Sequence, residues 1–68
     1  MILITNSREV IERIEADGWY DVNTKGSHIQ FKHPTKPGKV TVPHPEKNLK
    51  PKTVRNIERQ SGISLRKK

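Results

Sequence analysis

The spacing of the apolar residues changes from helical to alternating at Gly18, and this change limits the folds open to the chain. Upstream of Gly18, apolar residues recur at the period of a helix: Val10, Ile11 and Ile14. Asn6 is a good helix N-cap, and Glu9 three residues later makes a variant of the capping box. We therefore predict a helix from about Ser7 to Asp17, with Gly18 as a left-handed C-cap.

After Gly18, apolar and polar residues alternate in three short runs, which is the period of a β-strand. The first two runs are separated by the turn Lys25-Gly26-Ser27, and the last two by the proline-rich loop 34–38. Pro43 ends the third run. The pattern predicts a three-stranded antiparallel meander with one buried and one polar face.

The alternation also predicts which side chains lie on each face of this sheet. The face toward the helices would carry Tyr20, Val22, Ile29, Phe31, Val40 and Val42. The outward face would carry Asp21, Asn23, His28, Gln30, Lys32, Lys39 and Thr41. His33 falls on the opposite parity from His28, and Trp19 is expected to pack at the corner between helix and sheet.

A second helix follows the loop that begins at His44. Pro51 suits its first turn, and Ser61-Gly62 ends it. Beyond it, Ile63 and Leu65 are expected to fold back onto the core, and residues 66–68 to form a frayed basic tail. Residues 2–4 fit an edge strand, a packing arm or a poorly ordered end equally well. The predicted order is α-β-β-β-α, an α+β fold with both helices on one face of the sheet.

The composition of the chain limits its core size, its cross-links and its possible location in the cell. The chain has 68 residues, no cysteine and 29% hydrophobic residues, so disulfides are excluded and the core is small. No apolar run approaches the length of a membrane span, and residues 2–4 are too short for a signal-peptide core. We expect a cytoplasmic protein without membrane contact.

The charge of the chain is unevenly distributed. Residues 1–24 carry a net charge of −3, whereas residues 25–68 carry +10, out of +7 in total. Such asymmetry favours a polyanionic partner, most simply nucleic acid, over a basic surface kept only for solubility.

Three groups of residues together resemble the HicA (YcfA-like) toxin family. They are Gly26-Ser27-His28 with the strand that follows, the run 40–45, and Leu49-Lys50-Pro51-Lys52-Thr53-Val54-Arg55-Asn56-Ile57. The likeness extends upstream through 7–10 and 17–19, and covers the chain from about 6 to 63.

This resemblance implies a single HicA-like toxin domain over residues 1–68, from a type II toxin–antitoxin pair. It implies a metal-independent mRNA endoribonuclease with a double-stranded-RNA-binding-domain-like fold and no cofactor. It also implies neutralisation by a HicB-type antitoxin that covers the active site, and it places the catalytic histidine at His28.

On the residues alone, a strand-edge histidine is more often only a surface residue, and it is the resemblance that favours catalysis at His28. RNA carries its own nucleophile, the 2′-hydroxyl, so a metal-independent nuclease needs a base, an acid and positive charge at the phosphate. Histidine is suited to proton transfer near neutral pH, and we predict that His28 is the base, with the acid role as the alternative. The second proton carrier stays open: His33 and His44 are expected to be structural or exposed, and water or a lysine could serve.

Positive charge and small polar groups surround His28 in the predicted fold. Lys50 and Lys52 join a helix N-terminus, a natural phosphate site, while Ser27 either donates to phosphate or satisfies its own turn. We predict RNA contacts from Lys25, Gly26, Ser27, Lys32, Lys39, Lys50 and Lys52. No metal site is predicted, because the three histidines lack ligand spacing and there is no cysteine.

Two other classes of function fit the same basic sheet. One is a non-catalytic RNA-binding module of double-stranded-RNA-binding type, since that domain has the same element order, although shared order alone does not establish function. The other is a protein-interaction domain with negligible affinity for RNA at physiological salt.

Overall fold

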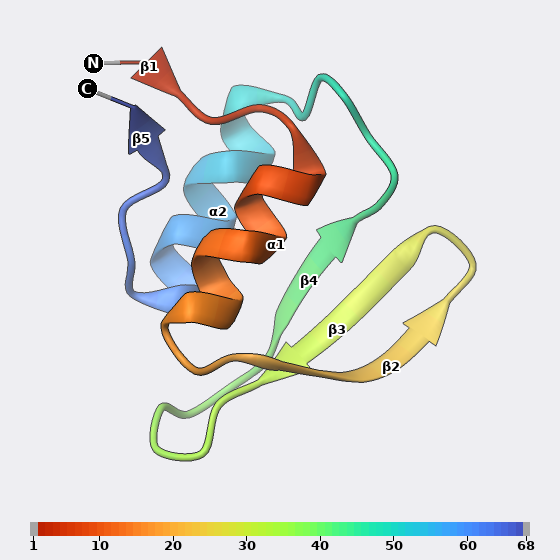
Figure 1. The fold of residues 1–68 in the computed structure, drawn as a ribbon, viewed down its shortest axis with the longest axis vertical. Helices are drawn as coiled ribbons and strands as arrows, with labels where there is room; N and C mark the ends of the chain where they lie inside the picture. Colours follow the sequence, from red (N-terminus) through yellow and green to blue (C-terminus); the bar gives the residue numbers. More distant parts are fainter. Residues whose placement is uncertain (1, 68) are drawn as a thin grey trace.

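Two helices pack on one face of a three-stranded antiparallel sheet in the computed structural model, which describes residues 2–67 (Figure 1). The helices are α1 (Ser7–Ala16) and α2 (Pro51–Ser61), and the sheet is formed by β2 (Tyr20–Lys25), β3 (His28–Lys32) and β4 (Val40–Pro43). The strands are neighbours in chain order, β2-β3-β4, which makes the sheet a meander. The predicted order α-β-β-β-α is confirmed.

The helix ends follow from their capping residues. The side chain of Asn6 accepts a hydrogen bond from the Arg8 backbone N–H at 2.9 Å and so begins α1. Pro51 occupies the first turn of α2, and Gly62 ends that helix in the left-handed conformation with its N–H donating to the Glu58 carbonyl. Both helices match the predicted bounds to within one residue.

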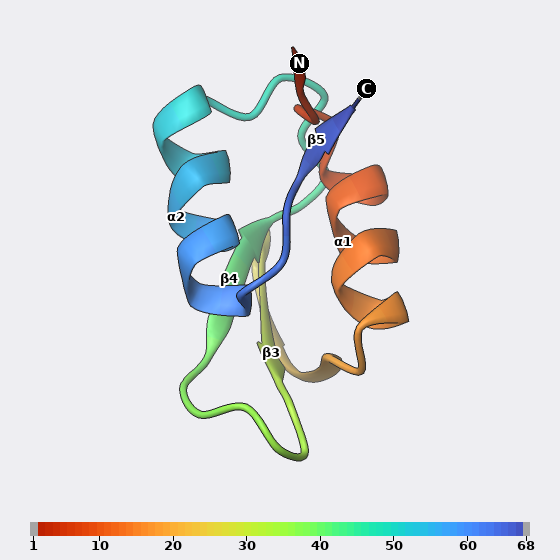
Figure 2. The same ribbon diagram turned by 90° about the vertical axis from the view of Figure 1, so that its left-hand side faces the viewer.

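The core lies between the helices and the part of the sheet nearest to them. Both helices contact β4, which lies behind them in Figure 2. Buried apolar side chains come from every layer: Ile4, Val10, Ile14, Trp19, Phe31, Val40, Val42, Leu49, Val54, Ile57 and Leu65. The predictions for Phe31, Val40, Val42 and Trp19 are confirmed, and Ile29 is half-buried. Within residues 2–67, neither helix covers the opposite face of the sheet (Figures 1 and 2).

Strand β2 departs from the predicted alternation. Its register against β3 shifts between Asp21 and Asn23, so Val22 is the extra residue of a β-bulge. Tyr20 therefore pairs with Lys32 and lies on the outward face, 49% exposed, whereas Asp21 pairs with buried Phe31. The predicted faces of Tyr20, Val22 and Asp21 are wrong for this reason. Since β2 is also the edge strand away from the helices, Val22 has little to pack against.

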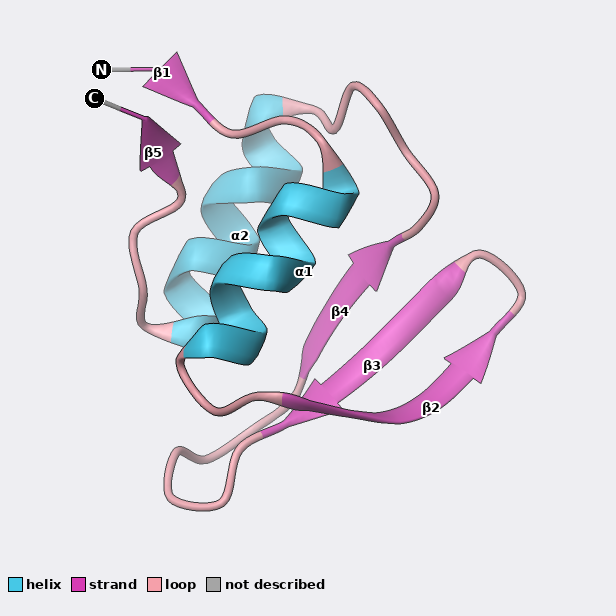
Figure 3. Cartoon of the chain, in the orientation of Figure 1, coloured by secondary structure: helices cyan, strands magenta, loops and turns pink. Residues whose placement is uncertain are grey.

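The two ends of the described chain form a second, two-stranded sheet. Strand β1 (Ile2–Leu3) pairs antiparallel with β5 (Arg66–Lys67), and Figure 3 shows this pair apart from the meander. Residues 2 and 3 are thus an edge strand, and the expected frayed tail is wrong for residues 66–67, while residue 68 lies outside the described residues. Glu58 stabilises this arrangement, because its side chain accepts from the Leu65 N–H at 2.7 Å and lies 3.6 Å from the Arg66 Nε.

Candidate active site

His28 is the first residue of β3, directly after the Gly26–Ser27 turn, and it is exposed. It pairs with Lys25 on β2 and with Pro43 on β4. Paired residues have Cβ atoms roughly 5 Å apart on the same face of a sheet, so the Lys25 side chain stands beside the imidazole. Gly26 has φ +61°, and a Cβ built there meets nothing within 4 Å. The glycine therefore serves the left-handed turn, not a close approach within the described chain.

A series of hydrogen bonds connects the turn before His28 to the first residue of α1. The backbone N–H of His44 donates to the Ser27 carbonyl at 2.6 Å. The ring of His44 is itself hydrogen-bonded through Nδ1 to the Ser7 hydroxyl, 2.8 Å away, and that hydroxyl also accepts from the Glu46 N–H at 2.9 Å. Ser7 is buried. His44 is thus structural, as predicted, and it fixes the turn that presents His28.

The uncovered face of the sheet carries three rows of side chains, which the pairing register defines. We call this surface the open face. Its rows are Lys25, His28 and Pro43; then Asn23, Gln30 and Thr41; then Tyr20 and Lys32. Successive rows are two residues apart along β3, about 7 Å. An imidazole, hydrogen-bonding side chains, an aromatic ring and lysines therefore share one surface.

The predicted basic residues fall into two groups. Lys25 and Lys32 lie on the open face with His28, and Lys39 precedes β4 at the position that extends the Lys32 row. Lys50 and Lys52 lie instead at the N-terminus of α2, where Lys50 is the N-cap and makes no side-chain capping bond. All five are exposed. The structure thus brings three of them to the sheet and leaves two at the start of a helix.

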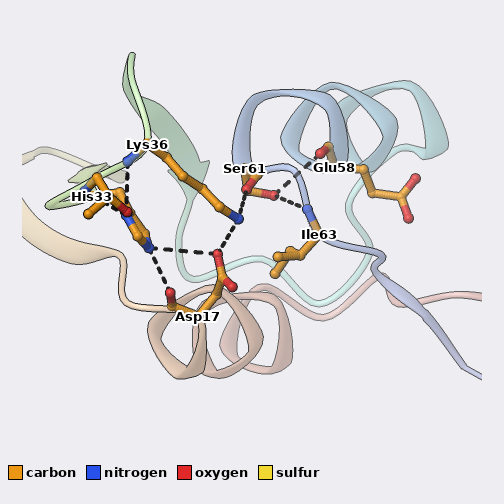
Figure 4. Close-up of polar contacts among 7 residues, drawn as sticks. Asp17, His33, Lys36, Glu58, Ser61 and Ile63 are labelled. Carbon is orange, nitrogen blue, oxygen red and sulfur yellow. Dashed lines mark hydrogen bonds and ion pairs between the residues drawn. The ribbon is translucent and has the colours of Figure 1, made fainter.

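His33 is part of a polar cluster on the other side of the sheet (Figure 4). Its Nε2 donates to the Asp17 carbonyl at 2.7 Å, and its Nδ1 accepts from the N–H groups of Thr35 and Lys36, each at 3.1 Å. The ring also packs edge-on against Trp19, with centroids 5.3 Å apart. Both ring nitrogens are therefore engaged, and His33 is structural, as expected.

Lys36 completes this cluster by joining three elements. Its ammonium donates to the Asp17 carboxylate at 2.5 Å and to the Ser61 carbonyl at 3.1 Å, so the loop after β3 is tied to the ends of both helices (Figure 4). The hydrogen bond from Lys36 lowers the pKa of Asp17 below its ordinary value of 3.8. This lysine is committed to the fold, unlike the lysines of the open face.

Two further classes of site can be checked on the described residues. Within residues 2–67, no group of three or more His, Cys, Asp or Glu side chains could hold a metal ion. Neither helix of this part of the chain is long and apolar enough to cross a membrane.

Sequence reasoning missed two contributors to the site. The alternation predicts Tyr20 in the core, because nothing in the run Tyr20-Asp21-Val22-Asn23 signals a bulge. The sequence predicts Ser7 only as the start of a helix. Its hydrogen bonds to His44 and Glu46 join residues that are 37 and 39 positions apart in the chain. The Ser-Arg-Glu run after Asn6 gives a capping signal but no sign of so distant a partner.

Comparison with known proteins places this arrangement in a family. The family model of the HicA toxin of bacterial toxin–antitoxin systems matches residues 7–63, which is most of the chain. No curated protein matches the sequence of this chain. The matched span includes both helices, the whole meander and the Gly-Ser-His turn. The chain therefore belongs to the HicA toxin family, and it is a toxin of a toxin–antitoxin system with an antitoxin as its partner.

Proposed function

We propose that this toxin is a metal-independent endoribonuclease that cleaves mRNA, with His28 as its acid–base group. The observation that carries this proposal is the position of His28. The imidazole is exposed at the start of β3, opposite Lys25, on a sheet face that neither helix covers in the described part of the chain. The Gly-Ser-His sequence around it lies within the span that matches the HicA family.

The proposed reaction uses the 2′-hydroxyl of the RNA as nucleophile. His28 takes the proton of that hydroxyl as its oxygen bonds to the adjacent phosphorus, and the bond from phosphorus to the 5′-oxygen breaks. The products are a 2′,3′-cyclic phosphate and a 5′-hydroxyl, so the nucleophile is the 2′-oxygen of the RNA and not a water molecule. The ammonium group of Lys25 stabilises the negative charge that develops on the phosphate oxygens.

The leaving 5′-oxygen needs a proton. The other two histidines are poorly placed to donate it. Both ring nitrogens of His33 are hydrogen-bonded within the fold. His44 follows Pro43, which shares the face of His28, so its ring lies on the helix side and bonds to Ser7. We assign the second proton transfer to Lys25 or to water. Either is a weaker acid than imidazolium, which predicts a slow enzyme.

The open face favours an extended single strand of RNA as substrate. Lys25, Lys32 and Lys39 are exposed on this face or at its edge and would contact phosphates of the bound strand. Gly26 and Ser27 at the turn, and Lys50 and Lys52 at the start of α2, would add further phosphate contacts. These contacts carry little sequence information, because they read the backbone and not the bases.

A HicB-type antitoxin would inhibit this toxin most simply by covering His28. The open face is basic, so the part of the antitoxin that meets it should be acidic. Such a partner competes with RNA for the same surface. We therefore expect bound antitoxin to prevent both RNA binding and cleavage.

The chemistry is tested by changing the RNA and leaving the protein unaltered. In the presence of EDTA, the purified toxin should cut a single-stranded RNA oligonucleotide and leave a 2′,3′-cyclic phosphate. A single 2′-deoxy nucleotide on the 5′ side of the cleaved bond should block that cut, since the nucleophile is then missing. Cleavage of the 2′-deoxy substrate, or a requirement for divalent metal, would overturn the proposed mechanism.

A non-catalytic RNA-binding module is the second candidate, and the start of α2 favours it. Lys50 and Lys52 combine two exposed cations with an uncapped helix N-terminus, which is enough to bind phosphate without chemistry. This candidate predicts intact RNA after incubation, and binding that depends on Lys50 and Lys52 more than on His28. Each lysine lost should reduce the slope of log affinity against log salt by roughly 0.7.

A further inference from the structure

The bulge in β2 puts an aromatic ring on the same face as His28. Tyr20 pairs with Lys32, and Lys32 lies four residues along β3 from His28, so all three side chains share the open face. The ring of Tyr20 is 49% exposed, and its hydroxyl makes no hydrogen bond within the described residues 2–67. A large apolar ring left half in water has no evident role in the core.

The position of Tyr20 is set by backbone pairing and not by loose packing. The preceding residue, Trp19, is buried, and its N–H donates to the Ile14 carbonyl at 3.1 Å. The following residue, Asp21, is paired with Phe31 and accepts from the Thr24 hydroxyl at 3.3 Å. The ring is therefore presented from a strand that is fixed on both sides.

We infer that Tyr20 is a stacking platform for a base of the bound RNA strand, on the far side of the open face from His28. This inference rests on the proposed RNA substrate and names how the protein would hold it. Exposed aromatic rings on a sheet with basic neighbours bind single-stranded nucleic acid because every base has a face that stacks. Lys32 beside the ring supplies the cation for the phosphate of the same nucleotide.

The spacing of the rows places the stacked base relative to the cleaved bond. Tyr20 lies opposite Lys32, four residues from His28 along β3, which is roughly 13 Å. In an extended strand this distance spans about two nucleotides, so the stacked base lies two nucleotides from the cut. Between the two ends lies the row Asn23, Gln30 and Thr41, whose amide and hydroxyl groups can hydrogen-bond the edge of the intervening base.

The experiment measures binding in the His28→Ala background, so that the RNA stays intact. The probe is a fluorescent single-stranded RNA whose cleaved bond has been mapped with the active toxin, and a set of copies each carries one abasic nucleotide. Tyr20→Ala should weaken binding of the intact probe about five- to a hundredfold, and Tyr20→Phe should bind normally. Val22→Ala is the control, since Val22 is also exposed in β2 but belongs to the bulge.

The abasic set identifies the contact. With Tyr20 present, affinity should fall sharply for one abasic position, two nucleotides from the mapped bond. With Tyr20→Ala, that position should become no more costly than its neighbours. A penalty that is unchanged by Tyr20→Ala, or a Tyr20→Ala protein that binds the intact probe normally, would overturn the inference.

The outcome also separates this inference from the proposed catalysis and from a protein-binding role. If His28→Ala left cleavage unchanged, the catalytic assignment would fail, and the abasic set would be measured on copies with a 2′-deoxy nucleotide on the 5′ side of the mapped bond, which keeps the RNA intact. If Tyr20→Ala weakened only binding of the antitoxin and left the abasic profile as it was, the ring would be a protein contact, and stacking would be wrong. Thermal unfolding of each variant shows whether the fold is kept.

Discussion

The hydroxyl of Ser7 joins the first turn of α1 to the end of the sheet that carries His28. It bonds to the His44 ring and to the Glu46 N–H, and His44 in turn donates to the Ser27 carbonyl. Because Ser7 is buried, water cannot replace these bonds without a rearrangement of the loop. A residue far from His28 in the chain therefore positions the turn that presents it.

Ser7→Ala should lower the stability of the toxin. The substitution removes the hydroxyl partner of two part-buried groups, the Glu46 N–H and the His44 Nδ1, which costs about 1–3 kcal/mol and lowers the melting temperature by roughly 5–20 °C. Thermal unfolding followed by circular dichroism measures the change. Ser64→Ala, at an exposed serine, should stay within about 0.5 kcal/mol of wild type. Equal stability of the two variants would show that the Ser7 bonds contribute nothing.

The Asp17 carboxylate should make stability depend on pH in the acid range. Its pKa is lowered by the hydrogen bond from Lys36, so the folded protein releases this proton more readily than the unfolded chain does. The contribution is therefore complete above the ordinary pKa of 3.8 and is lost as the pH falls through the lower folded value. Asp17→Asn should destabilise the protein at pH 6, and this difference should shrink below about pH 4.

Melting temperatures measured from pH 6 to pH 2 check this dependence. Glu12→Gln is the control, because Glu12 is exposed on α1 and forms no ion pair within residues 2–67. A gap between wild type and Asp17→Asn that stays constant down to pH 2 would contradict the assigned role of the Lys36 bond.

At the scale of elements, the sequence predicts what local chemistry decides. Caps set the ends of both helices, and Pro51 and Gly62 mark α2 to the residue. The bulge at Val22 has no such local signal, because it depends on how β2 fits the twist of β3. This one extra residue moves every side chain before it in β2 to the opposite face of the sheet. Strict alternation therefore predicts the wrong face for Tyr20.

The junction between α1 and β2 gives a prediction at this scale. A Cβ at Gly18 would lie 2.7 Å from the His33 Nε2, and its φ of +110° also disfavours a side chain, whereas Gly26 has only the positive φ. Gly26→Ala should cost about 1–2 kcal/mol, and Gly18→Ala roughly 1–2 kcal/mol more, since His33 must move and lose hydrogen bonds. Urea unfolding measures both, and equal losses would mean that His33 does not resist displacement.

In the molecule as a whole, one face of the meander forms the core and the other is exposed to solvent. One face packs Phe31, Val40 and Val42 against the helices and holds the fold, and the other exposes His28 among lysines. Alternation along β3 and β4 predicted this division. The pairing of β5 with β1 was not predictable from local sequence, because it needs the two ends of the chain to meet. Glu58 holds the segment that leads into β5, through the Leu65 N–H and the Arg66 side chain.

The most direct test of His28 as the catalytic group is the rate of RNA cleavage in EDTA, measured for wild type beside His28→Ala. A Gln60→Ala variant, changed at an exposed position of α2 and purified in the same way, controls for contaminating ribonuclease. We predict that His28→Ala keeps its melting temperature and loses roughly 10²–10⁴-fold in single-turnover rate, while Gln60→Ala cuts at the wild-type rate. If His28→Ala cut RNA as fast as wild type, His28 would not be the catalytic group.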